Sequence, residues 1–255
     1  NYHSAFCTTG GFSQIGVSLK SVCCDQLNSA AHMQFPFCFN QIKAQCKTYG
    51  GSIARQGASH LWFIEREENM KVGLIADTHM PGSIEQLWPQ VTKAFADVDV
   101  ILHAGDLHTL DVVDELCRLA PTYVAIGNGD VGIEDERLKE TWMLDFDGIK
   151  VGMIHHFPSP ARKSPEVIAK RVDRHFDEQP DIVIFGHTHF EGVYQVNDLL
   201  CINPGSPTLP RNQSLRMGTI GHLEISERDI SVVIHQITES GLDPHGEIEH
   251  LTIRR

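Results

Sequence analysis

The sequence has no apolar run approaching the 18 residues of a membrane-spanning helix, and no internal repeat or low-complexity tract. Its start lacks the basic residues and apolar stretch of a secretory signal peptide. Positive charge is also scarce, because 21 Lys and Arg stand against 33 Asp and Glu, for a formal net charge of −12. This shortage argues against nonspecific binding to long nucleic acids. With 41% hydrophobic and 21% charged residues, the 255-residue chain has an ordinary globular composition.

Cysteine placement excludes the usual cysteine-built sites. Five of the seven cysteines precede residue 70, and their spacings fit no zinc-binding pattern. Their odd number and the missing signal peptide argue against a secreted disulfide framework. We therefore expect free thiols in a reducing compartment, and a cytoplasmic protein.

Composition changes abruptly at Met70. Residues 1–69 carry five Lys and Arg against four Asp and Glu, and show no sustained period of 2 or 3.6. Residues 70–255 carry 16 against 29, and they begin with a clean apolar strand over 72–76. We interpret 1–69 as an N-terminal extension of unknown role outside the core fold, 70–240 as the folded domain and 241–255 as a polar C-terminal tail.

After Met70, strands and helices alternate, which is typical of an α/β layer with parallel strands. Ser83 to Gln86 form a capping box that predicts a helix start. From Gly192 to about Ile237, short strands separated by turns predict an antiparallel stretch. The expected strands are 71–76, 98–103, 121–126, 150–154 and 181–185, and the expected helices are 83–95, 109–119 and 164–176.

Five short polar clusters each follow an expected apolar strand. In open α/β sheets, ligands bind at the edge formed by the carboxyl ends of the strands. The clusters are Asp77-Thr78-His79, Gly105-Asp106, Gly127-Asn128-Gly129-Asp130, His155-His156 and Gly186-His187-Thr188-His189.

The clusters supply oxygen and nitrogen donors without thiolate, which suits Mn, Fe, Ni, Zn or Co. Asp77 and His79 are two residues apart and face one side of an extended chain. Glycine precedes three of the donor positions, where it allows a sharp turn. One four-coordinate ion cannot use seven donors, whereas two ions about 3.5–4 Å apart can share one carboxylate. The donors are Asp77, His79, Asp106, Asn128, His155, His187 and His189.

Each cluster alone has a simpler explanation. An Asp-x-His pair is commonly a surface or capping feature, and Gly-Asp and Gly-Asn-Gly-Asp are commonly turns. What favours a metal site is the ordered set, with every member at a strand end.

The order D-x-H, GD, GN-x-D, H and GH-x-H resembles the calcineurin-like metallophosphoesterase family. The later turn Asn203-Pro204-Gly205-Ser206 is similar to the NPGS turn of the family's small phosphodiesterase branch, found in bacteria and archaea. The resemblance covers about residues 70–237 and implies a two-sheet α/β sandwich with helices on its outer faces. The retromer small subunit resembles the same fold and uses it for protein contacts.

The resemblance also implies two divalent metal ions, with Mn²⁺ preferred and Ni²⁺, Zn²⁺, Fe²⁺ or Co²⁺ as alternatives. It divides the seven donors into Asp77, His79 and His189 on one ion, Asn128, His155 and His187 on the other, and Asp106 bridging.

The chain departs from the phosphatases of this family at Gly129. They carry there the His of GNH-[DE], which is assigned to protonating the leaving group, whereas the small phosphodiesterases often lack it. His108 and His156 are the alternative proton donors, although an ordinary surface histidine is the commoner explanation for each. We expect Asp130 to orient a neighbouring group rather than to bind metal. The candidate catalytic residues are Asp106, Asn128, Asp130, His108 and His156.

These observations predict a dinuclear metal-dependent phosphodiesterase that hydrolyses small phosphodiesters by attack of a metal-bound hydroxide. The alternatives are a phosphomonoesterase or nucleotide hydrolase on the same scaffold, and a non-catalytic protein-interaction module. We expect no long nucleic acid and no membrane as partner, and a homo-oligomer stays open. Arg162 and Lys163 could contact a phosphate, although solvated loop charges are the simpler explanation.

Overall fold

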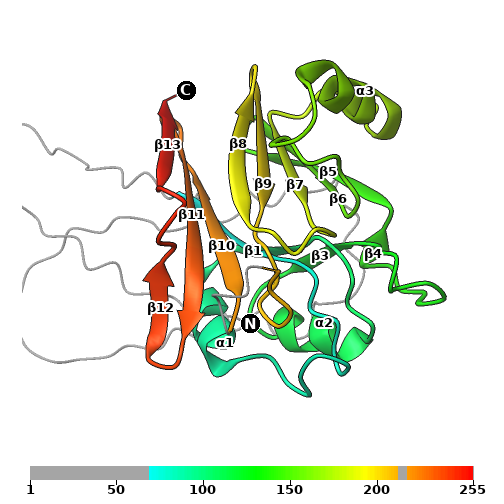
Figure 1. Ribbon diagram of the computed structural model, residues 1–255, viewed down its shortest axis with the longest axis vertical. Helices are drawn as coiled ribbons and strands as arrows, with labels where there is room; N and C mark the ends of the chain where they lie inside the picture. The colour runs from blue at the N-terminus through cyan, green and yellow to red at the C-terminus, as the bar shows by residue number, and fades with distance from the viewer. Residues whose placement is uncertain (1–68, 212–216, 255) are drawn as a thin grey trace, which may run out of the picture. The chain divides into compact units, whose positions relative to one another are not determined.

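The computed structural model describes residues 69–211 and 217–254, which form two β-sheets flanked by helices (Figure 1). The first sheet has the strand order β12-β11-β10-β1-β2-β3-β4, and β13 also pairs with β11. Strands β1, β2 and β3 are parallel, and β10 pairs with β1 antiparallel. Its strands are β1 (Met70–Ile75), β2 (Val100–His103), β3 (Thr122–Ala125), β4 (Leu138–Lys139), β10 (Thr219–Ile225), β11 (Asp229–Thr238), β12 (Gly241–Pro244) and β13 (Leu251–Arg254).

The second sheet has the order β5-β6-β7-β9-β8. Its three central strands, β6, β7 and β9, are parallel, and β5 and β8 pair antiparallel at the two edges. Its strands are β5 (Thr141–Phe146), β6 (Ile149–Ile154), β7 (Ile182–Phe185), β8 (Gly192–Val196) and β9 (Leu199–Asn203).

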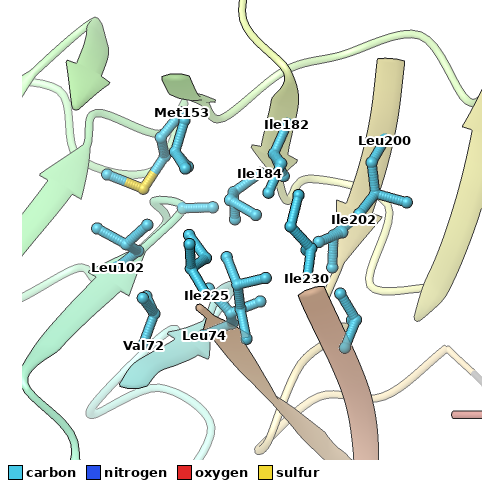
Figure 2. Close-up of a cluster of buried hydrophobic side chains, with 14 of the residues drawn as sticks. Val72, Leu74, Leu102, Met153, Ile182, Ile184, Leu200, Ile202, Ile225 and Ile230 are labelled. Carbon is cyan, nitrogen blue, oxygen red and sulfur yellow. The ribbon is translucent and has the colours of Figure 1, made fainter. Parts of the chain in front are cut away.

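The main hydrophobic core lies between the facing sheets (Figure 2). Leu74 and Leu102 of the first sheet pack in one cluster with Ile184 and Ile202 of the second. All four side chains are fully buried. Because both faces of these central strands are covered, their sequences read as continuous apolar runs rather than as alternating ones.

Helices cover the outer faces. Ile75 and Ile101 point away from the inter-sheet core and pack with Val91 and Val113 of helices α1 and α2. Helix α3 packs similarly on the second sheet. This arrangement confirms the two-sheet α/β sandwich. Within the described residues, no helix is both long and apolar enough to cross a bilayer. The helices are α1 (Pro89–Ala94), followed by the 3₁₀ turn η2 (Phe95–Asp97), α2 (Leu110–Cys117) and α3 (Pro165–His175).

The helix expected over residues 83–95 is wrong at its start, because α1 begins only at Pro89. The Ser83 hydroxyl donates to the Thr78 carbonyl at 2.6 Å instead of capping a helix. Pro89 also disfavours helical dihedrals at Trp88, which has φ −56° and ψ 132°. The capping box therefore lies in a loop.

The polar tail expected over residues 241–255 is also wrong, since β12 and β13 both pair with β11. Leu251 and Ile253 alternate with polar residues and pack against the inter-sheet core. That period of 2 is the pattern of a half-buried strand. The extension expected over 1–69 lies, apart from Asn69, outside the described residues.

Candidate metal centre

Every predicted donor lies within four residues after the carboxyl end of a strand. Three strands of the first sheet and two of the second end at the same edge of the sandwich. The donors are Asp77 and His79 after β1, Asp106 after β2, Asn128 after β3, His155 after β6, and His187 and His189 after β7.

The backbone at this edge is held in the left-handed region. Among the described residues, eight non-glycine residues have positive φ, and six of them belong to these loops. Each such residue costs on the order of 1 kcal/mol, and such strain gathers at functional sites. The six are Asp77 (54°), His79 (46°), Asp106 (59°), His108 (71°), His187 (69°) and His189 (57°).

One group of donor atoms consists of Asp77, His79 and His189, whose candidate ligand atoms lie within 4.8 Å of one another. His79 Nε2 lies 3.1 Å from His189 Nε2, and His189 Nε2 lies 3.7 Å from Asp77 Oδ1. Burial lowers the pKa of His79 to about 4, so its ring is neutral and offers a lone pair.

A second group surrounds Asn128. Its Oδ1 lies 2.8 Å from His187 Nδ1 and 3.2 Å from His155 Nε2. Asp106 lies between the two groups, because its Oδ1 is 3.4 Å from His155 Nε2 and its Oδ2 is 3.5 Å from His79 Nε2. Asp77 also lies within 4.8 Å of Asp106 and His155, so the two aspartates adjoin.

The histidine tautomers leave lone pairs facing other acceptors. His155 Nδ1 lies 2.7 Å from the Ala104 carbonyl and His189 Nδ1 lies 2.7 Å from the Leu209 carbonyl, so each must donate its proton there. In the neutral ring, Nε2 is then a lone pair, yet His155 Nε2 faces Asn128 Oδ1 and Asp106 Oδ1. Burial opposes a charged His155, but Asp106, Asp77 and the Ala104 carbonyl together outweigh it and raise the pKa of the ring. A proton or a metal cation resolves such a cluster of acceptors.

Asp77 gives the sharpest test of whether a metal fits. Its side chain is fully buried, and its Oδ2 has no hydrogen-bond partner in the part of the chain that the structure describes. Oδ1 accepts from the His187 N–H at 3.0 Å. Burial raises the pKa of this carboxyl to about 7. A buried carboxylate oxygen without a donor is costly unless a cation compensates it, so the donor set fits a divalent metal.

Asp130 has a different environment from the donors. Its two carboxylate oxygens accept from the backbone N–H groups of four residues at 2.7–3.0 Å. The carboxylate thus ties the loop after β2 to the loop after β3. These bonds support the interpretation of Asp130 as an orienting residue. The four donors are Asp106, Leu107, His108 and Gly127.

The Asn203–Ser206 turn ties the remaining loops together. Asn203 Nδ2 donates to the Gly186 carbonyl at 3.1 Å, and Ser206 Oγ donates to the Asp77 carbonyl at 2.7 Å. Thr208 Oγ1 donates to the Thr78 carbonyl at 2.7 Å. Sequence reasoning missed Thr208, because a threonine two residues beyond a turn carries no signal of its partner.

His108 fills the space beside Gly129. Its Nε2 lies 2.9 Å from His79 Nδ1, and a Cβ built on Gly129 would lie only 2.2 Å from that same Nε2. His156 is exposed and stacks edge-on against His187, with ring centroids 4.5 Å apart. His108 therefore borders the donor group of His79, and His156 borders the donor group of His187.

Comparison with known proteins shows the family of the chain. Residues 70–228 match the calcineurin-like phosphoesterase superfamily domain, and that range contains all seven donors. The chain belongs to this superfamily. This is a family of metal-dependent hydrolases of phosphoric esters, and the chain has candidate ligands for a metal in two overlapping sets, Asp77, His79 and His189, and Asp77, Asp106 and His155.

Curated relatives are archaeal and bacterial. A probable metallophosphoesterase of Methanothermobacter thermautotrophicus is 36% identical over 144 residues, covering 56% of this chain and 80% of that protein. A phosphodiesterase of Methanocaldococcus jannaschii is 30% identical over 151 residues, covering 53% and 83%.

Solved structures share the fold. Vacuolar Protein Sorting 29 of Cryptosporidium parvum matches with a TM-score of 0.62 at 17% identity, covering 73% of this chain and 99% of that one. A predicted phosphoesterase of Streptococcus pneumoniae matches with a TM-score of 0.55 at 18% identity, covering 74% and 100%.

Proposed function

We propose that this calcineurin-like phosphoesterase is a dinuclear phosphodiesterase that hydrolyses small phosphodiesters. The observation that carries the proposal is the position of Asp106, whose two carboxylate oxygens face different donor groups. Asp77, His79 and His189 would hold one divalent ion, with Mn²⁺ preferred. Two such ions, when bound, lower the pKa of a coordinated water and offset negative charge on a phosphoryl group.

The protein's own residues orient this site. The Gly129 N–H donates to Asp106 Oδ1 at 2.7 Å. Burial alone would raise the pKa of Asp106, but the adjacent His155 ring and the bond from the Gly129 N–H hold it well below its usual range. Asp106 is therefore a carboxylate throughout the neutral pH range, as a shared ligand must be.

Diester specificity is supported by the absence of an imidazole at position 129 and by the name of the Methanocaldococcus jannaschii relative. His108 is the better placed substitute, because its ring takes the space of a side chain at 129 and contacts His79. We assign to His108 the orientation of His79, through the contact between His108 Nε2 and His79 Nδ1. In this proposal the His108 imidazole also donates a proton to the leaving group. His156 lies beside the other donor group.

The test compares hydrolysis of bis-p-nitrophenyl phosphate with that of p-nitrophenyl phosphate. Each substrate is assayed with metal-free protein and with Mn²⁺, Ni²⁺ or Zn²⁺. We expect metal-dependent cleavage with preference for the diester. Preference for the monoester would replace the diesterase by a phosphomonoesterase, and inactivity with every metal would favour a protein-interaction module.

A further inference from the structure

A cleft with two arginines adjoins the donor set. Its volume is about 410 Å³, and its described lining includes His187 together with Arg162, Arg211, Tyr194 and Phe190. This volume lies in the range of about 300–1,000 Å³ typical of small-ligand sites. His187 lines the cleft and is also a predicted metal ligand. One part of a substrate could therefore lie in the cleft while another part lies at the donor set.

The cleft has the charge that the rest of the domain lacks. Residues 70–255 hold 16 Lys and Arg against 29 Asp and Glu, yet two guanidinium groups line this one cleft. Neither arginine side chain makes an ion pair or hydrogen bond with another described residue. Both are exposed. They are therefore available to an anion, and a guanidinium matches the oxygens of a phosphate bidentately.

The described lining has one acidic residue against two arginines, and that residue, Glu191, has a partner of its own. The Glu191 side chain is only 4% exposed, and its Oε1 lies 3.1 Å from His245 Nε2. His245 Nδ1 accepts from the Glu247 N–H and the Ile248 N–H, so Nε2 carries the proton that is donated to Glu191. The Glu191 carboxylate is thus buried and bonded to His245, whereas both arginines are exposed.

Phe190 adds an apolar surface at the same place. It follows His189 directly and is 43% exposed, in a position where a phenyl ring is available for stacking. Exposed aromatic rings beside cationic side chains are the usual means of holding a nucleobase together with its phosphate.

We propose that this cleft binds the second half of the diester, and that this half carries its own phosphate and an aromatic base. The substrate class is thus a short 5′-phosphorylated nucleotide diester rather than a neutral dialkyl or diaryl phosphate. A terminal phosphate carries about −1.5 to −2 charge, which two guanidinium groups match. This inference rests on the proposed diesterase function for its catalytic consequence, but the binding site itself does not require it.

The test uses dithymidine (TpT) with and without a 5′-phosphate, two probes that differ only in the terminal phosphate. For the wild-type protein with Mn²⁺ we expect kcat/KM to be about tenfold higher for the phosphorylated probe, mainly through KM. Arg162→Gln and Arg211→Gln should each bring that ratio toward 1. Lys163→Gln removes the adjacent exposed cation, which is outside the described lining, and should keep the ratio. Phe190→Leu should raise KM for both probes by a similar factor.

A binding measurement separates this inference from the proposed function. Calorimetry on the metal-free full chain in EDTA should show the same preference for the phosphorylated probe, and its loss in both arginine variants. If the protein binds with this preference but cleaves neither probe, nor bis-p-nitrophenyl phosphate, the diesterase proposal fails and the subsite stands. If diesters are cleaved while the two probes bind and react equally, or the arginine variants keep the preference, the subsite is wrong.

Discussion

Histidines in the interior of this protein and histidines at the strand-end edge differ in whether each ring nitrogen has a complementary hydrogen-bond partner. His103 accepts from the Gly105 N–H at Nδ1, and its Nε2–H therefore points to Thr78 Oγ1 at 3.1 Å. His245 accepts from two backbone N–H groups and donates to Glu191. At both, each ring nitrogen meets a complementary partner, so these rings need nothing more from solvent or ligand.

At the strand-end edge the matching fails. His155 and His189 each use their proton on a backbone carbonyl, and their Nε2 lone pairs converge on oxygens and on another imidazole. The difference separates the candidate ligand histidines from the structural ones by where their ring protons go. Their places in the sequence only suggest the role.

The largest effect is expected for Asp106→Ala, which removes the carboxylate that faces both donor groups. We expect kcat/KM for bis-p-nitrophenyl phosphate to fall at least about 100-fold. Asp111→Ala is the matched control, since Asp111 is exposed in the first turn of α2. Near-normal activity of Asp106→Ala would contradict the shared-ligand assignment.

In the metal-free protein, the buried Asp77 carboxylate should destabilise the fold at high pH. Its folded pKa is about 7, against 3.8 for the free group, so between these values the folded chain binds a proton that the unfolded chain lacks. The contribution to stability is present at low pH and is lost as pH rises through 7. In EDTA at pH 8, Asp77→Asn should therefore be more stable than wild type, by about 2–4 kcal/mol.

Thermal unfolding with EDTA and with Mn²⁺ at pH 5 and pH 8 checks this prediction. Saturating Mn²⁺ should reverse the order of wild type and Asp77→Asn, because only the wild type has the full ligand set. If the stability of the two metal-free proteins depends on pH in the same way, ionisation of Asp77 does not destabilise the fold, and the prediction is wrong.

His155→Ala and His245→Ala should differ in whether they mainly lower metal content or mainly lower stability. His245→Ala takes a donor from buried Glu191, and we expect the free energy of unfolding to fall by about 1–3 kcal/mol without loss of bound metal. His155→Ala should lower metal content with a smaller loss of stability in the metal-free state. Urea unfolding and elemental analysis of both variants measure the two quantities.

The smallest effect is expected for Gly129→Ala. Its Cβ would meet His108 Nε2 at 2.2 Å, so the ring must move, and we expect kcat to fall about 2–10-fold. The double variant Gly129→Ala/His108→Ala should have nearly the same kcat as His108→Ala alone, because the clash needs the His108 ring. A double-mutant cycle measures this coupling. Gly246→Ala, where a Cβ meets nothing within 4 Å, is the control.

The sequence predicted the strands and their polar ends well, because buried parallel strands are apolar throughout and the donors stand just beyond them. It did not predict that Asp130 would accept four backbone N–H groups, since such bonds depend on how two loops meet in space. The capping box at Ser83 misled for a related reason. A tertiary bond to Thr78 and the following proline outweighed a local preference.

Strands β12 and β13 escaped prediction because each has only four residues and stands among acidic and glycine residues. Arg211 likewise had no signal, since only the fold brings it to the cleft that Arg162 also lines.

The number of metal ions bound per chain tests the central claim most directly. Metal-free protein is equilibrated with Mn²⁺ by dialysis, and bound metal is counted by atomic absorption for wild type and Asp106→Ala. The account predicts two ions per wild-type chain and the loss of tight binding at both positions in the variant. A single ion per wild-type chain, or two ions retained by Asp106→Ala, would contradict it.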